Sequence, residues 1–109
     1  MPKKTILHVE SGPAGPDVAA EYNRWYDEVH IPEMLTIEGI VAARRYAPAG
    51  GDGPYIAHYE IEGDPKAALK RLQDAASDGT MHLSDTARTD PPPRMLILEL
   101  VAEQDAASG

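Results

Sequence analysis

The chain has 109 residues, of which 42% are apolar and 26% charged, and its 10 basic and 18 acidic side chains give a net charge of −8. This length and composition are typical of one globular domain, which we expect to span residues 1–109. The basic residues are scattered along the sequence and predict no positive stripe that could bind nucleic acid. No apolar run approaches the roughly 20 residues needed to cross a bilayer, so no membrane partner is expected.

Cysteine is absent from the sequence. Its absence excludes disulfides, a thiolate nucleophile and cysteine-based metal sites. The opening residues MPKKTILHVE contain only a short apolar stretch and no small-residue cleavage site, unlike a secretion signal. We therefore expect a cytoplasmic protein.

The first two predicted elements are a strand and a helix. Residues 5–10 (TILHVE) alternate in polarity and are rich in strand-forming residues, which predicts a strand. Pro16 suits the first turn of a helix, because its missing N–H has no partner there in any case. Pro32 cannot donate to the carbonyl four residues back and disfavours helical geometry at Ile31, so we expect the helix to end or kink just after His30.

A hairpin and a second helix follow. Residues 40–47 (IVAARRYA) and 55–62 (YIAHYEIE) predict two strands, joined by the glycine-rich turn PAGGDGP. Asp64 is the predicted N-cap and Pro65 the first residue of a helix that ends before Gly79.

The last predicted strand is RMLILEL, which follows an irregular segment, and residues 103–109 form a predicted frayed tail. The order β-α-β-β-α-β predicts an α+β, ferredoxin-like fold with a core over about residues 5–102: a four-stranded antiparallel sheet with both helices on one face. The last strand is apolar on both sides, as in a strand that is buried on both faces. We therefore expect a second copy to cover the free face, forming a homodimer.

The stretch YNRWYDEVHIPEML, residues 22–35, combines an aromatic stripe with a histidine. At helical spacing Tyr22, Trp25 and Tyr26 share one face, and His30 lies at its edge, one turn beyond Tyr26. A pocket between this helix and the sheet, walled by these rings, would suit a flat and partly apolar ligand.

One acidic residue and one amide residue lie near His30 on the predicted helix. Asp27, three residues earlier, can orient the imidazole or stabilise its cation, and Asn23 lies along the same edge. The structural alternative is that the aromatic residues form ordinary core and that His30 only interacts with the dipole at the helix end.

Four further residues are candidates. His8 and His58 lie on predicted strands, where they line either the pocket or the dimer interface. Tyr46, at a strand end, can donate a hydrogen bond to a substrate oxygen or simply pack. His82 belongs to an irregular segment that acts either as a lid or as a solvated loop.

Metal and nucleotide sites are not predicted. The four histidines are widely separated and form neither H-x-H nor H-E-x-x-H. The glycine-rich segments SGPAGP and AGGDGP match neither a dinucleotide fingerprint nor a P-loop. We therefore expect no metal and no cofactor.

The segments EYNRWYDEVHIPEML, GIVAARRY and YIAHYEIEGDP resemble the dimeric α/β-barrel superfamily in order and spacing. They are most similar to the small proteins of the ethyl tert-butyl ether degradation (EthD)-like family and to 4-methylmuconolactone methylisomerase. The most specific element is an aromatic helix followed by His-x-Pro, matched here by Tyr22, Trp25, Tyr26, His30 and Pro32. The resemblance implies the ferredoxin-like fold and a dimer. Because the superfamily includes cofactor-free isomerases, cyclases and monooxygenases as well as haem proteins, it restricts the reaction only loosely. The position of His58 is usually apolar in these relatives.

The leading hypothesis is a cofactor-independent isomerase, lyase or cyclase that uses general acid/base catalysis on a small, partly apolar carbonyl, lactone or phenolic compound. His30 is the expected base, and Tyr26, Tyr46 and His58 are the expected hydrogen-bond donors. The expected substrate-binding residues are Tyr22, Trp25, His8, Asn23 and His82. The alternatives are a cofactor-free monooxygenase of a phenolic or polyketide-like substrate and a non-catalytic carrier of small molecules.

Overall fold

The fold is known from a computed structural model that describes residues 4–51 and 53–107. The elements follow in the order β1 (Thr5–Ser11), η1 (Pro16–Val18), α1 (Ala19–Trp25), η2 (Tyr26–His30), α2 (Ile31–Met34), β2 (Ile40–Tyr46), β3 (Tyr55–Ile61), α3 (Pro65–Ser77) and β4 (Arg94–Glu99). Each strand ends one residue away from its predicted C-terminal bound. Residues 1–3, 108 and 109 of the predicted domain and its tail lie outside the described residues, as does residue 52 of the predicted hairpin turn.

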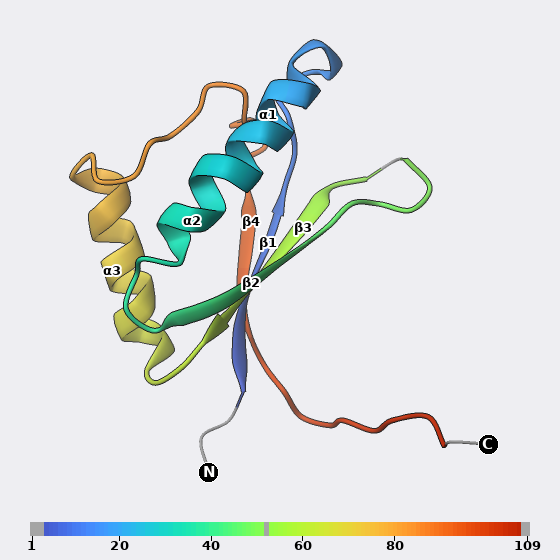
Figure 1. The fold of residues 1–109 in the computed structure, drawn as a ribbon, viewed down its shortest axis with the longest axis vertical. Helices are drawn as coiled ribbons and strands as arrows, with labels where there is room; N and C mark the ends of the chain where they lie inside the picture. Colours follow the sequence, from blue (N-terminus) through green and yellow to red (C-terminus); the bar gives the residue numbers. More distant parts are fainter. Residues whose placement is uncertain (1–3, 52, 108–109) are drawn as a thin grey trace.

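The four strands form one antiparallel sheet in the order β2-β3-β1-β4. The helices all lie on one face of this sheet (Figure 1). The predicted ferredoxin-like α+β fold is therefore confirmed. No helix in the described part of the chain is long and apolar enough to cross a membrane.

Strand alternation sets which residues enter the core. In the β1–β3 pair Leu7 lies opposite Tyr59, and both are buried on the face that the helices cover. The next pair, His8 and His58, faces the opposite side because successive side chains alternate across a strand. The core is consequently confined to the layer between the sheet and the helices.

Of the two outcomes predicted after His30, an end or a kink, the first is wrong: the helix does not end there, and the irregularity is a π-helical turn that precedes Ile31. Helical structure continues through Pro32 to Met34, because Tyr26–His30 forms a π-helical turn. In this turn the N–H of Ile31 donates to the carbonyl of Tyr26, five residues back. The extra residue widens the helix, so that the ring of Pro32 does not meet the carbonyl of the preceding turn at regular α-helical distance.

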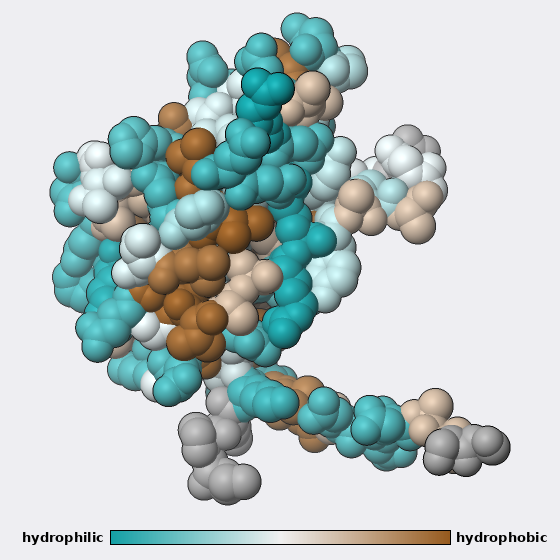
Figure 2. Space-filling model, in the orientation of Figure 1, coloured by the Kyte–Doolittle hydropathy of each residue, from teal (hydrophilic) through white to brown (hydrophobic). Residues whose placement is uncertain are grey.

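The last strand is exposed on both faces within one chain. Met95 and Leu96, which point to opposite faces, are 54% and 37% exposed, and the tail that follows β4 extends away from the body (Figure 1). Figure 2 shows a further apolar patch beside α2 and α3, at the lower end of the helical layer. The burial that the sequence predicts for β4 is thus not met inside a single chain.

Candidate functional site

The π-helical turn places His30 against two of the aromatic rings that the sequence predicts beside it. Its imidazole stacks on Trp25, with ring centres 4.8 Å apart and planes 25° apart. It meets Tyr26 nearly edge-on, at 4.8 Å and 71°. Tyr22 completes the cluster through its contact with Tyr26. The predicted aromatic stripe therefore forms one continuous group of rings that encloses His30 on two sides.

Burial holds the His30 ring neutral. Removal of the imidazole from water lowers its pKa to about 4; the Glu33 carboxylate raises this pKa, and the Arg45 guanidinium lowers it. The Nδ1 atom is buried and has no hydrogen-bond partner among the described residues. At neutral pH the ring is therefore uncharged, and one of its nitrogen atoms is left free for a hydrogen bond or a proton.

Arg45 is a central member of this cluster that the sequence analysis missed. Its guanidinium carbon lies 4.4 Å from the ring centre of Tyr26, 4.7 Å from that of Tyr55 and 5.4 Å from that of Tyr22. Such contacts are attractive because the face of an aromatic ring is electron-rich. Arg45 pairs with Ala57 across the β2–β3 ladder and so faces the helices. Because side chains alternate along a strand, the inward direction of Arg45 could have been predicted from its position in the strand.

The polar partners of Arg45 are Asp27, which was expected to orient His30, and Asn23, which was expected to bind substrate. The carboxylate of Asp27 accepts a hydrogen bond from Arg45 at 3.1 Å, and the Asn23 side-chain oxygen accepts another at 2.7 Å. The structure therefore places Asp27 on Arg45 rather than on His30, whose pKa responds to Glu33 and Arg45. The Nε atom of Arg45 is buried without a partner in the described part of the chain.

The tyrosine hydroxyls form two contacts, one buried and one partly buried. The hydroxyl of Tyr59 donates to that of Tyr26 at 3.0 Å. Burial raises the pKa of both phenols, so both remain protonated at neutral pH. The Tyr22 hydroxyl lies 2.6 Å from the Ser11 hydroxyl at the end of β1. These rings and Arg45 occupy the space between α1 and the sheet in which a ligand pocket was expected.

The segment around His82 lies across the outer edge of the cluster. The indole N–H of Trp25 donates to the His82 carbonyl at 2.8 Å. The backbone N–H of His82 donates to Glu33 at 2.9 Å, and its imidazole lies 2.5 Å from the other oxygen of the same carboxylate. These contacts lower the pKa of Glu33. Glu33, also missed from sequence, joins the segment around His82 to the helix that carries His30.

The remaining predicted residues lie on the opposite face of the sheet. His8 and His58 are adjacent, with Nδ1 of His8 2.9 Å from Nε2 of His58, and the Tyr46 ring contacts His58 with ring centres 5.4 Å apart. Burial is the main cause that lowers the pKa of His58. The sheet separates this group from His30, so His58 and Tyr46 are not assembled with His30 and Tyr26 within one chain.

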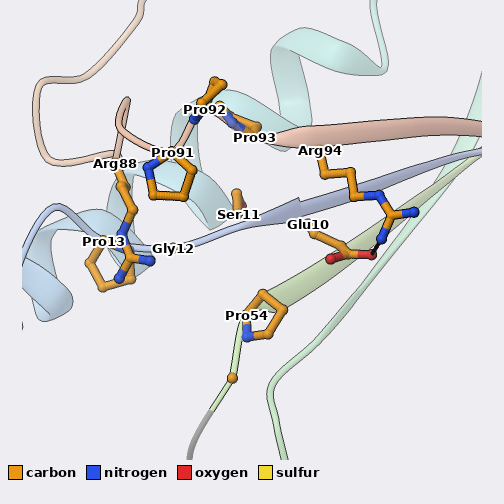
Figure 3. A pocket seen from close by; sticks show the side chains of 11 residues that line it. Glu10, Ser11, Gly12, Pro13, Pro54, Arg88, Pro91, Pro92, Pro93 and Arg94 are labelled. Atoms are coloured by element: carbon orange, nitrogen blue, oxygen red, sulfur yellow. Dashed lines mark ion pairs between the residues drawn. The ribbon is translucent and has the colours of Figure 1, made fainter.

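Two pockets lie outside the aromatic cluster. One, of about 480 Å³, adjoins the end of β1 and a proline-rich segment (Figure 3). The other, of about 550 Å³, is lined by residues of β1, β3 and β4, among them Ile6, Glu60 and Leu98. Neither pocket is lined by a histidine, tyrosine, methionine or cysteine, so neither offers a usual axial ligand for haem.

No family model and no curated protein matches this sequence. Among solved structures, the chain is similar to a monooxygenase from the ActVA-Orf6 gene of Streptomyces coelicolor in complex with nanaomycin D. The two are 14% identical over 96% of this chain and 94% of that one, with a TM-score of 0.64.

A variant of MhuD with two manganese protoporphyrin IX molecules in each active site is 12% identical, over 95% of this chain and 99% of that one, with a TM-score of 0.61. Rv0793 from Mycobacterium tuberculosis is 18% identical over the same two shares, with a TM-score of 0.53. At such identities the similarity shows a shared fold alone. The finer resemblance to EthD-like proteins and to a muconolactone isomerase is not shown.

Proposed function

We propose that this chain is an enzyme that uses His30 as a base on a small, partly apolar phenol or carbonyl compound and needs no bound cofactor. The observation that carries the proposal is the half-buried, neutral imidazole between Trp25 and Tyr26, whose Nδ1 atom has no partner among the described residues. A neutral imidazole beside aromatic rings is suited to accept a proton from a flat substrate. Because Nδ1 is buried, the segment around His82, which contacts Trp25, would have to move aside before a substrate could reach this atom.

The low pKa of His30 sets a condition on this chemistry. Proton transfer from a phenol of pKa about 10 to a base of pKa about 4 is unfavourable by about 8 kcal/mol if the two products do not interact. The attraction between the new imidazolium and phenolate offsets about 4 kcal/mol of this at 4 Å and an effective dielectric constant of 20. The remaining cost is small beside the barrier of an ordinary enzymatic reaction, so deprotonation is feasible as a transient step. The guanidinium of Arg45 would further stabilise the anion.

The fate of the deprotonated substrate distinguishes two reaction types. Reprotonation at another atom gives an isomerase, one of the three enzyme types (isomerase, lyase or cyclase) expected from the sequence. Reaction with oxygen gives a monooxygenase: a phenolic ring takes up one atom of O₂ as a new carbonyl, and the other atom leaves as water with the two hydrogens that the ring loses. The substrate itself then supplies both electrons. The shared fold with the ActVA-Orf6 monooxygenase supports this second reaction.

We also propose that the functional unit is a homodimer. The open face of the sheet carries exposed apolar residues on β4, including Leu96 and Leu98, beside the His8–His58 pair. A second copy that packs on this face would bury these residues and separate the histidine pair from solvent.

The proposal is tested by supplying a panel of phenols and cyclic ketones to the purified protein. Oxygen uptake identifies oxygenation, and incorporation of solvent deuterium identifies proton transfer. His30→Gln should lower the rate about 10²–10⁴-fold, the usual contribution of a general base. Glu28→Gln is the matched control, because Glu28 lies exposed on the same turn. Tight binding of panel compounds without either reaction, or equal rates for the wild type and His30→Gln, would contradict the proposal.

A further inference from the structure

The pocket at the end of β1 combines rigid proline walls with polar and charged side chains. Proline rings from three separate segments line it, among them Pro13, Pro54 and Pro91 (Figure 3). A proline ring has no backbone N–H, so these walls supply no hydrogen-bond donor. The volume of about 480 Å³ is sufficient for a small organic molecule.

Among the described residues, three charged side chains line the same pocket, and one of them has no partner of opposite charge. Arg94 lies 3.6 Å from the Glu10 carboxylate, which also lies 3.0 Å from His8. Arg88 has no carboxylate partner within residues 4–51 and 53–107. Two arginines and one glutamate leave a local charge of +1 in a chain whose net charge is −8.

The backbone fixes the position from which Arg88 reaches the pocket. The N–H of Arg88 donates to the carbonyl of Gly12 at 2.8 Å, and the N–H of Ala14 donates to that of Thr86 at 2.7 Å. The guanidinium lies over Gly12, where an added Cβ would stand 3.9 Å from Nη2. In Figure 3 the Arg88 side chain passes Pro91 and ends beside Pro13 and Gly12, on the wall of the pocket. The segment that carries Arg88 is thus tied at two points to the residues that follow β1. Its guanidinium lies beside the proline rings.

We propose that this pocket binds a small organic monoanion with a flat apolar body, such as an aromatic carboxylate, whose charged group pairs with Arg88. A guanidinium binds a carboxylate through two parallel hydrogen bonds, which are strong because both partners are charged. The proline rings supply apolar contact for the body of the ligand. This site is separate from His30, which does not line the pocket, and it does not depend on the reaction proposed there.

The test uses benzoate as the probe and its neutral analogue benzamide as the matched ligand, with binding followed by calorimetry and by NMR shifts of Gly12 and Arg88. We expect saturable binding of benzoate and at least tenfold weaker binding of benzamide. Arg88→Gln should weaken benzoate binding at least about tenfold, since it removes the charge and the guanidinium fork. Arg88→Lys should retain part of the affinity, because it keeps the charge alone.

Arg24→Gln controls for the change in net charge, because Arg24 is exposed on α1 and does not line the pocket. It should leave benzoate binding unchanged, as should His30→Gln. The proposal is overturned if benzoate shows no saturable binding up to about 10 mM. It is equally overturned if benzamide binds as well as benzoate, or if Arg24→Gln weakens binding as much as Arg88→Gln does.

Discussion

The free energy of unfolding should depend on pH through His30. Its pKa is about 4 in the folded chain, against an ordinary value of about 6.5 when the chain is unfolded. Between these values the unfolded state binds the proton more readily, so stability falls as the pH is lowered from 6.5 to 4, by at most about 1.4 kcal/mol per pH unit. Above pH 6.5 the ring is neutral in both states and has no such effect.

Urea unfolding at pH 4.5, 5.5 and 6.5 measures this effect when the wild type is compared with His30→Gln. The variant should lose less stability on acidification. The pKa of His58 is also lowered, but His58 is present in both proteins and cancels in the comparison. Identical pH dependence in the two proteins would show that the imidazole is solvated in the folded state.

Trp25 supports His30 from one side, and its replacement should have two effects. Its indole stacks on the imidazole and donates to the His82 carbonyl. Since the ring is only half-buried, Trp25→Ala should cost less than the ~3–5 kcal/mol typical of a fully buried aromatic ring. It should also expose His30 to water and raise its pKa. Trp25→Phe, which keeps a ring but loses the indole N–H, should change the free energy of unfolding and the pKa of His30 less than Trp25→Ala does. Unfolding free energies and an NMR titration measure them, and an unchanged pKa in Trp25→Ala would refute the supporting role.

Among the elements, the π-helical turn decides where His30 points. One added residue in a helical turn rotates everything that follows by about 100° relative to a regular helix. Pro32 is the chemical cause that the sequence offers, because it has no N–H to donate within a regular α-helix. The turn allows the helix to continue while the imidazole is retained against Trp25 and Tyr26.

Pro32→Ala restores the missing N–H and should convert this turn to regular α-helix. His30 would then leave its position between the two rings, and its pKa should rise from about 4 toward 6.5. An NMR titration of the variant measures the change, with Pro48→Ala in the hairpin turn as the control. If the pKa of His30 stays low in Pro32→Ala, the aromatic packing and not the proline holds the turn.

At the scale of the whole molecule, the open face of the sheet should join two copies. Leu98 lies on this face, on the exposed β4 strand. Leu98→Glu would place a charge in the proposed interface and should give monomers, whereas Leu83→Glu should leave the dimer intact, because Leu83 lies in the segment that follows α3. Light scattering at micromolar concentration measures the mass. A monomeric wild type would be incompatible with the proposed dimer.

Strand alternation and element order were sufficient to predict the fold, since β1 and β3 each pair an apolar side with a more polar one. The grouping of Tyr22, Trp25, Tyr26 and His30 was also predictable from helical spacing. The continuation of the first helix past Pro32 was not predictable, because the rule that proline ends a helix takes no account of a π-helical turn. Arg45 was missed because a cation at an inward strand position contradicts the usual pattern unless aromatic rings and a carboxylate surround it. Those partners come from the distant α1, from η2 and from β3.

The central claim is that the fold holds His30 as a neutral base at physiological pH. Its most direct test is an NMR titration of the imidazole ring nitrogens in the ligand-free wild type, with His30→Gln used to assign the signals. The structure predicts that His30 stays neutral from pH 8 to well below 6.5 and titrates near 4. A midpoint at or above 6.5 would contradict the claim, because His30 would then be an ordinary solvated residue on the surface of the helix.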